Sequence, residues 1–275
     1  MQMRKPAAGP LTFGGCFVEL WGMRLDISRF LDSWEYQPGK IVVRKIKGKD
    51  GQPKIQLRVD LGILQMNLTG RPDGKMPFGH ESLFEHYLAR LAKHADAQGS
   101  DPSGFKLTVE DCSKLQQEVI QFHHRYICLF QLKEYDAVIR DTERNLAVFD
   151  FVNQFADTPE IAANIGQLRP QLLMMRARAK GSKETEADQH STAIDTIEQT
   201  MEEIRTFFRD QNRPELAELS GEIQSLQQWS QEIRSTRPLS QREQLEQALN
   251  DAVRREDYEK AAEVRDALRN LKSVS

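Results

Sequence analysis

Apolar and polar positions near the start of the chain follow the spacing of a short helix and then of strands. The segment from Asp26 to Trp34 has helical spacing and is closed by Pro38-Gly39, a pair that ends helices. Residues 41–46 and 55–61 have the composition of strands. One face of the second strand is entirely apolar and is therefore expected to be buried; it consists of Ile55, Leu57, Val59 and Leu61.

Turn residues divide this region. Residues 49–53, Lys-Asp-Gly-Gln-Pro, predict the turn of a β-hairpin, because Asp-Gly is a strong hairpin signal. The apolar positions after the second strand move to the opposite parity, so we expect Gly62 to mark a bulge or bend. Gly70–Gly74, Gly-Arg-Pro-Asp-Gly, predicts another turn, since proline presets φ and glycine accepts a left-handed conformation. A plain turn is favoured; presentation of Arg71 or Lys75 to a ligand is the alternative.

The spacing becomes helical from about residue 80 onwards. Residues 80–93 predict a helix, and the turn-rich run 98–104 is the strongest domain boundary in the chain. Two apolar stripes follow, separated by residues 132–134, and predict an antiparallel pair of helices. The stripes are Leu115, Val119, Phe122, Tyr126 and Leu129, then Tyr135, Val138, Thr142, Leu146, Phe149 and Val152.

A second set of helices is predicted on the same plan. Its first helix is expected to bend at Pro170, and residues 181–188 are expected to form the polar connection to the next helix. A break is predicted at residues 212–214, after which helical spacing resumes. The stripes are Ile161, Ile165, Leu168, Leu172 and Met175, then Ile194, Ile197, Met201, Ile204 and Phe208, then Leu216, Leu219, Ile223, Leu226 and Ile233.

These consecutive helical hairpins resemble degenerate tetratricopeptide repeats. Leu129, Tyr135 and Val138 stand where that repeat places large, aromatic and small residues, although Tyr126 occupies its glycine position. The predicted fold class is mainly α, in three parts. These are a small α+β N-terminal domain with a β-hairpin at residues 1–98, antiparallel helical hairpins at residues 105–235, and a C-terminal helical hairpin at residues 239–275.

The C-terminal hairpin has its own start and stop signals. Residues 240–243, Ser-Gln-Arg-Glu, have the spacing of a capping box and predict the start of a helix. That helix carries an apolar stripe of Leu245, Leu249 and then Ala252 or Val253. Asp257 is expected to cap a second helix. The inward face of the second helix is predicted to be Tyr258, Ala261, Ala262, Leu268 and Leu271.

This hairpin resembles the UVR motif of excinuclease subunits B and C. The resemblance rests on the first stripe and on residues 256–268, Glu-Asp-Tyr-Glu-Lys-Ala-Ala-Glu-Val-Arg-Asp-Ala-Leu. It implies a helical hairpin that binds other proteins: in that family it joins the two excinuclease subunits, and it recurs in ClpC-type unfoldases and in activators of protein arginine kinases. It transfers no catalytic residue. The partner-binding residues are then Leu245, Leu249, Val253, Asp257, Tyr258, Ala261, Ala262, Arg265 and Leu268.

Size supports an interaction role independently of that resemblance. A hairpin of roughly 30 residues is shorter than the roughly 40 at which a chain without disulfides or metals sustains its own core. We therefore expect its apolar face to need a partner. Packing of that face on the preceding helices of the same chain is the alternative.

The rest of the chain carries a less specific resemblance. The order of the segments 26–34, 60–66 and 70–74 before a terminal UVR hairpin resembles a group of uncharacterised bacterial UVR proteins. This resemblance adds no chemistry, because no established activity belongs to the group.

Composition narrows the classes of protein to consider. The 38 Lys and Arg against 41 Asp and Glu give a net charge of −3, which lacks the basic bias of a general nucleic-acid binder. Cys16, Cys112 and Cys128 are odd in number and far apart, which argues against a disulfide framework and for the cytoplasm. No stretch approaches the roughly 18 apolar residues of a membrane span, so no membrane association is expected.

Catalytic signatures are missing from the sequence. It contains no phosphate-binding Gly-x-x-x-x-Gly-Lys, dinucleotide-binding Gly-x-Gly-x-x-Gly, His-Glu-x-x-His or Gly-x-Ser-x-Gly motif. We therefore expect no enzyme and no cofactor; an enzyme would have to use residues 70–79, without a recognised constellation. Adjacent His123 and His124 point to different helix faces, unlike an i, i+4 pair, so no metal site is predicted. The Cys-x-x-Cys pairs of the kinase activators are also missing, which argues against an activator role.

Basic residues concentrate between residues 40 and 58, where Asp50 is the one acidic residue. Such a cluster can neutralise phosphates, with binding that depends strongly on salt. An exposed strand edge kept soluble by lysine is the favoured alternative. No aromatic residue is interleaved there, which argues against stacking of single-stranded bases. The candidate nucleic-acid-binding residues are Lys40, Arg44, Lys45, Lys47, Lys49 and Lys54.

Taken as a whole, the sequence predicts a non-catalytic cytoplasmic adaptor that binds another protein through the C-terminal hairpin. The partner classes are an excinuclease subunit, a AAA+ unfoldase or a second copy of the chain. The alternative is an accessory factor of nucleotide excision DNA repair, in which the hairpin contacts an excinuclease subunit and the basic cluster touches nucleic acid.

Overall fold

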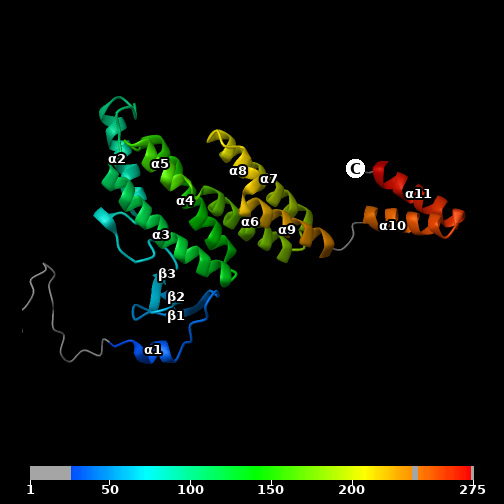
Figure 1. Cartoon of the computed structure of the whole chain (residues 1–275), viewed down its shortest axis with the longest axis horizontal. Helices are drawn as coiled ribbons and strands as arrows, with labels where there is room; N and C mark the ends of the chain where they lie inside the picture. Colours follow the sequence, from blue (N-terminus) through cyan, green and yellow to red (C-terminus); the bar gives the residue numbers. More distant parts are fainter. Residues whose placement is uncertain (1–25, 237–240, 274–275) are drawn as a thin grey trace, which may run out of the picture.

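A computed structural model describes residues 26–236 and 241–273, with the side chains of residues 241–243 and 270–273 excepted. Figure 1 shows a mainly helical chain with one small sheet. The elements of the N-terminal part are α1 (Ser28–Asp32), β1 (Val42–Lys47), β2 (Pro53–Val59), β3 (Gly62–Asn67), the 3-10 helix η1 (Pro77–Gly79) and α2 (Leu83–Ala97). The remaining helices are α3 (Val109–Gln131), α4 (Tyr135–Phe155), α5 (Pro159–Gly166), α6 (Arg169–Glu186), α7 (His190–Asp210), α8 (Glu215–Leu219), α9 (Gly221–Thr236), α10 (Gln241–Arg254) and α11 (Tyr258–Ser273).

The sheet has three antiparallel strands in the order β1-β2-β3, one more than the predicted β-hairpin. Val59 pairs with Gly62, so Asp60 and Leu61 form a two-residue turn and the chain reverses there. The apolar positions change parity because the chain reverses here, so the prediction of a bulge at Gly62 is wrong. Leu61 was predicted to be buried but is 87 % exposed at the turn.

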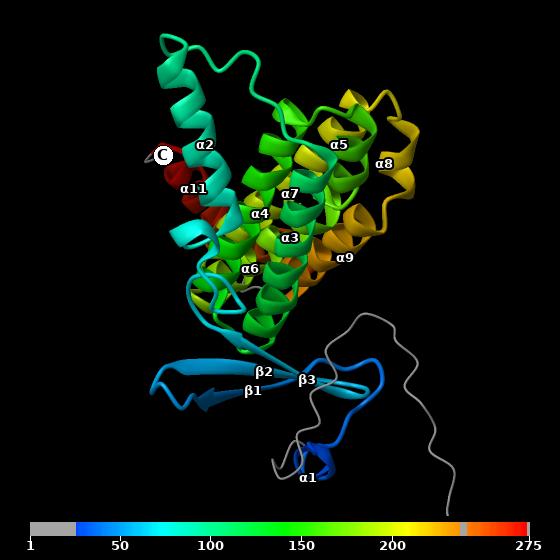
Figure 2. The same cartoon turned by 90° about the vertical axis from the view of Figure 1, so that its left-hand side faces the viewer.

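One face of the sheet packs on the helices. Ile55 on β2 is fully buried and pairs with buried Met66 on β3, and both belong to the main hydrophobic core. Figure 2 shows the helices on one side of the sheet and α1 on the other. Arg58, which the alternation placed on the solvent side, is also buried. Its guanidinium donates to the carbonyl oxygens of Trp34 (2.8 Å) and Gly62 (3.2 Å), and so ties the β2–β3 turn to the segment that follows α1.

The helical stripes of α3, α4 and α7 are confirmed. Leu115 and Leu129 on α3, and Val138 and Val152 on α4, are fully buried where these two helices pack together. A capping box starts α3: Thr108 accepts from the amide of Asp111, whose carboxylate accepts from the amide of Thr108. Helix α6 packs against α4 and α7, and α7 packs against α9, so the body is a series of stacked antiparallel helices.

Three predicted boundaries in the second helical set are wrong. The helix expected to bend at Pro170 instead breaks between α5 and α6, where Leu168 is 45 % exposed. Pro170 lies in the first turn of α6, where its missing N–H costs no intrahelical hydrogen bond. Most of the connection expected at residues 181–188 is helical: α6 continues to Glu186, and the turn to α7 begins only at residue 187. The resumed helix breaks again between α8 and α9, which leaves Leu219 exposed.

The hydrophobic core is continuous through the sheet and the helical body. Its buried residues run from Ile55 on β2 to Ile233 on α9. Among the described residues, Ala252 and Ala261 of the C-terminal hairpin (residues 241–273) are buried but lie outside this core. Figure 1 accordingly shows α10 and α11 packed together and apart from the helical body. The domain limits stay a prediction.

Gly181 is the point at which α6 approaches the ring of Trp229 on α9. A Cβ on Gly181 would lie 2.7 Å from Cη2 of Trp229. We expect Gly181→Ala to lower the free energy of unfolding by about 1–3 kcal/mol, because the clash outweighs the roughly 1 kcal/mol that alanine gains over glycine in a helix. The measurement is a urea titration followed by circular dichroism.

Gly166→Ala on α5 is the matched control for this prediction. Nothing lies within 4 Å of a Cβ at that position, so the substitution should raise the stability by about 0.4–1 kcal/mol. Equal urea midpoints for the two variants would show that Trp229 does not restrict the residue at position 181.

Candidate functional site

The C-terminal hairpin is closed by small residues at its seam. Ala252 on α10 and Ala261 on α11 are buried against the opposite helix, and the small side chains let the two helices approach closely. The flanking apolar positions are only half-buried, so the pair covers each of them in part. These positions are Leu245, Leu249, Ala262 and Leu268.

Backbone hydrogen bonds fix the turn of this hairpin. The amide of Asp257 donates to the carbonyl of Ala252 (2.9 Å) and the amide of Glu256 to that of Val253 (3.0 Å). Glu256 has φ +59°, so the end of α10 is a Schellman motif with a glutamate in the left-handed position. The carboxylate of Asp257 then accepts from the amide of Lys260 at 3.1 Å. The predicted cap of the second helix is therefore confirmed, whereas the side chains of the capping box at Ser240 and Glu243, and that of Leu271, lie outside the described set.

Two apolar residues of the hairpin point to solvent beside this turn. Val253 is 53 % exposed and Tyr258 is 71 % exposed. Placement of Tyr258 on the inward face was therefore wrong: it is the first residue of α11, one turn before the seam residue Ala261. Arg265 contacts the neighbouring carboxylate of Asp266 at 3.4 Å, and both side chains are exposed, a kind of pair that contributes little to stability.

The predicted basic cluster is partly neutralised within the chain. Lys45 pairs with Glu134 just before α4, and Lys54 lies 2.9 Å from Asp50. Arg44 lies 4.0 Å over the ring of Trp34 and donates to Gln56 Oε1 at 2.8 Å. Three of the six candidate residues are therefore engaged in contacts that stabilise the sheet.

The other three candidates remain available to a ligand. Lys40, Lys47 and Lys49 are exposed and make no ion pair with any residue that the structure describes. The fold also brings aromatic rings to this region from outside the strands: Trp34 stacks on Arg44, and Tyr36 lies 5.9 Å from the guanidinium of Arg58. Sequence order did not show this proximity.

A buried ion network joins the sheet to the helices, and the sequence reasoning missed it. Arg125 on α3 makes two hydrogen bonds to Asp141 on α4, at 2.6 and 2.8 Å, and both side chains are buried. Its Nη1 donates to the carbonyl oxygens of Asn67 (3.1 Å) and Gly70 (2.7 Å). Arg125 therefore holds the end of β3 and the following turn on the surface of α3 and α4.

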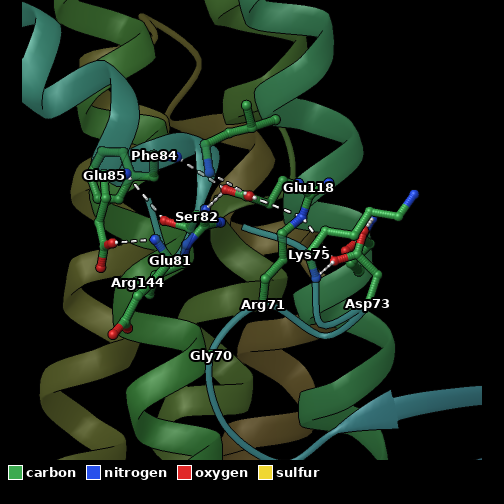
Figure 3. Close-up of polar contacts among 12 residues, drawn as sticks. Gly70, Arg71, Asp73, Lys75, Glu81, Ser82, Phe84, Glu85, Glu118 and Arg144 are labelled. Atoms are coloured by element: carbon green, nitrogen blue, oxygen red, sulfur yellow. Dashed lines mark hydrogen bonds and ion pairs between the residues drawn. The ribbon is translucent and has the colours of Figure 1, made fainter. Parts of the chain in front are cut away.

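Glu118 forms the second half of the network. Its fully buried carboxylate accepts from the amides of Leu83 (2.8 Å) and Phe84 (3.2 Å) at the start of α2. It also pairs with Arg144 of α4 and lies 3.4 Å from Nε of Arg71. Figure 3 shows this carboxylate between Arg71 and the first turn of α2. Burial lowers the pKa of Arg144, and the charge of Glu118 opposes that shift.

This network bears on the two interpretations of the Gly70–Gly74 turn. The side chain of Arg71 is mostly buried between Glu118 and Asp73, and the amide of Lys75 donates to Asp73 at 3.0 Å. The plain-turn interpretation is favoured over presentation of Arg71 to a ligand. A signal for the network was present in the sequence, because Glu118 and Arg125 flank the apolar stripe of α3 two helical turns apart.

A cleft of about 810 Å³ lies between α4, α5, α6, α7 and α8. Asp150 at its rim pairs with Arg169 (2.6 Å), and Glu203 pairs with Arg176 (2.5 Å). Both carboxylates are therefore already paired with arginines of α6.

The described residues offer neither a metal site nor a membrane-spanning helix. No group of three or more His, Cys, Asp or Glu side chains among them is placed to hold a metal ion. None of the described helices is long and apolar enough to cross a membrane. Cys112 and Cys128 are buried and form no disulfide, and Cys16 lies outside the described residues.

Comparison with known families gives one match. Residues 240–274 match the family model of the UvrB/uvrC motif, UVR, which covers α10, α11 and the residues beside them. Comparisons with curated proteins and with solved structures gave no match. The family match therefore identifies the C-terminal hairpin as a UVR motif and says nothing of the sheet or of the helical body.

The buried pair of Arg125 and Asp141 should dominate the stability of the helical body. We expect Asp141→Asn to lower the free energy of unfolding by about 3–5 kcal/mol, because it leaves Arg125 as a buried charge without its counterion. Asp136→Asn is the control, since Asp136 and its partner Lys183 are exposed and such a pair is worth at most about 1 kcal/mol. Thermal unfolding of both variants measures the difference, and equal losses would contradict the assignment.

Proposed function

We propose that this protein is a non-catalytic cytoplasmic adaptor that binds another protein through its UVR hairpin, residues 241–273. The carrying observation is the UVR motif itself, which mediates protein interactions in excinuclease-type proteins. The partner is a helical segment of another protein, with an excinuclease subunit or a AAA+ unfoldase as the classes that the motif suggests.

The geometry of the hairpin supports docking through the turn end. Val253, near the end of α10, and Tyr258, the first residue of α11, are both exposed on either side of the turn that joins the two helices. Aromatic and aliphatic side chains that become buried on binding supply most of the affinity of protein interfaces. The half-buried positions Leu245, Leu249 and Leu268 continue the apolar surface along the two helices.

The separation of the hairpin from the body supports the same proposal. Its buried residues lie outside the main core, and Figure 1 shows no body helix laid along it. The apolar surface of α10 and α11 is therefore open to a partner. This arrangement argues against the alternative in which the hairpin packs on the preceding helices of its own chain.

Deletion of residues 239–275 should abolish capture of the partner in affinity purification from the native host. The double change Val253→Ser and Tyr258→Ser should weaken capture at least tenfold, since each anchor contributes on the order of 1–2 kcal/mol. Neither side chain is part of the alanine seam, so the hairpin should keep its helicity, as judged by circular dichroism.

Arg254→Ser with Glu259→Ser is the matched control, because both side chains are exposed beside the same turn. This double variant should retain the partner set of the unaltered chain. A set of captured proteins that is the same for the full chain and the deletion would refute the adaptor proposal.

A second candidate function is an accessory role in nucleotide excision DNA repair. Exposed Lys40, Lys47 and Lys49 lack ion-pair partners among the described residues, and this observation favours contact with phosphates. Trp34 and Tyr36 add aromatic surface beside the basic strands, which single-stranded binders use to stack bases. In this role the UVR hairpin would contact an excinuclease subunit.

Titration of a fluorescent single-stranded DNA tests this candidate. Three lysine–phosphate contacts predict that binding weakens roughly twentyfold between about 50 and 200 mM salt. Lys47→Glu with Lys49→Glu should remove most of the low-salt binding, and the reversal of Lys45 should add less, since it is paired with Glu134. Lys93→Glu with Lys106→Glu, at exposed positions elsewhere, is the control. No binding at low salt would eliminate the repair role.

A further inference from the structure

A small cavity of about 230 Å³ lies between α3, α4 and the junction of α5 with α6. Ile120, His123 and Tyr126 line it from α3, Phe149 from α4, and Leu168 and Gln171 from the junction and α6. It is separate from the UVR hairpin and from the basic strands. It exists because the helix breaks at residue 168 rather than continuing straight into α6.

The lining of this cavity carries no formal charge. It contains no Asp, Glu, Lys or Arg side chain. Burial, followed by the nearby His124, lowers the pKa of His123, so its imidazole is neutral near pH 7. Burial raises the pKa of Tyr126, whose hydroxyl therefore stays protonated. An ionised ligand would lose its hydration here without gaining a counterion, so the occupant must be uncharged.

A hydrogen-bonded pair of polar side chains on α3 gives the cavity a polar end. Nδ1 of His123 lies 2.6 Å from the hydroxyl of Tyr126 in a hydrogen bond, which leaves the other ring nitrogen, Nε2, for a ligand. Whether Nε2 donates or accepts depends on the tautomer, and a hydroxyl group serves either case because it does both. Asn145 and Gln171 also line the cavity; the side-chain amide of Asn145 already donates to the carbonyl of Val119 and accepts from Arg144. The other walls are aliphatic or aromatic.

The mouth of the cavity is apolar and exposed. Ile120 and Leu168 are each 45 % exposed beside it. The volume is smaller than the roughly 300–1,000 Å³ of pockets for drug-sized ligands, and it suits a single ring. We propose that this pocket binds a phenol: an uncharged aromatic ring whose hydroxyl meets His123 and whose ring packs on Phe149 and the aliphatic walls.

Two sources can supply a phenol, a free small molecule or a tyrosine side chain. Among the tyrosines that the structure describes, Tyr258 of the UVR hairpin is the one that is largely exposed, at 71 %. A second copy of the chain is therefore a specific source to test. The pocket does not depend on the proposed adaptor role, since none of its lining residues belongs to the hairpin.

The test uses p-cresol, the side-chain analogue of tyrosine, with the full chain labelled for NMR at its histidine rings. We expect p-cresol to shift the ring signals of His123 in a saturable way, and toluene, which lacks the hydroxyl, to bind at least fivefold more weakly. His123→Phe should remove that preference while His124→Phe, a change at the adjacent residue, should keep it. Deletion of residues 239–275 should leave p-cresol binding unchanged, so this result is independent of the adaptor proposal.

Leu168→Trp provides a second variant if His123→Phe does not fold, because an indole at the exposed mouth should close the pocket and abolish binding.

Sedimentation velocity identifies the source of the phenol. If the chain self-associates and either p-cresol or Tyr258→Phe disrupts that self-association, the source is a second copy of the chain. If the chain is a monomer that binds p-cresol, the source is a free ligand or another partner. No shift at His123 up to the solubility limit of p-cresol, or equal binding of toluene, would overturn the proposal.

Discussion

The buried ion pair between Arg125 and Asp141 is the interaction on which the arrangement of this molecule depends. A buried guanidinium is tolerated only when its donors are satisfied. Arg125 donates to a carboxylate on α4 and to two carbonyl oxygens, one at the end of β3 and one in the turn that follows. The same side chain thus joins two helices and the sheet. Glu118, two turns before Arg125 on α3, holds the first turn of α2 in the same way. The sheet is consequently a fixed part of the helical body.

This construction leaves few surfaces for partners. Most of the charged side chains in the first half of the chain make contacts that stabilise the fold. Arg71 and Arg144 pair with Glu118, Arg58 donates to backbone carbonyls at a turn, and Lys45 pairs with Glu134. The UVR hairpin differs, because its seam of alanines closes without covering the apolar residues beside the turn. This contrast supports the proposed adaptor role, in which the helical body carries a separate docking hairpin.

The helical spacing of apolar residues was enough to locate most of the helices, because the residues that a helix buries recur every three to four positions along its own segment. The stripes of α3, α4 and α7 and the cap at Asp257 were predicted for that reason. Spacing failed where two local structures share one pattern. A change of parity at Gly62 fits a bulge as well as a reversal, and a glycine such as Gly181 ends a helix as readily as it admits the ring of Trp229.

By itself, the sequence determined that the chain is mainly helical and that it ends in a UVR motif, because both are local properties of residues close together. Only the tertiary structure decided which charges are buried, since Glu118 and Arg125 meet their partners from other elements. It also decided that Tyr258 faces solvent, because the rotation of α11 is set by the packing of Ala261 on α10. The pocket at His123 is likewise a product of how α3, α4 and α6 meet, and no one segment encodes it.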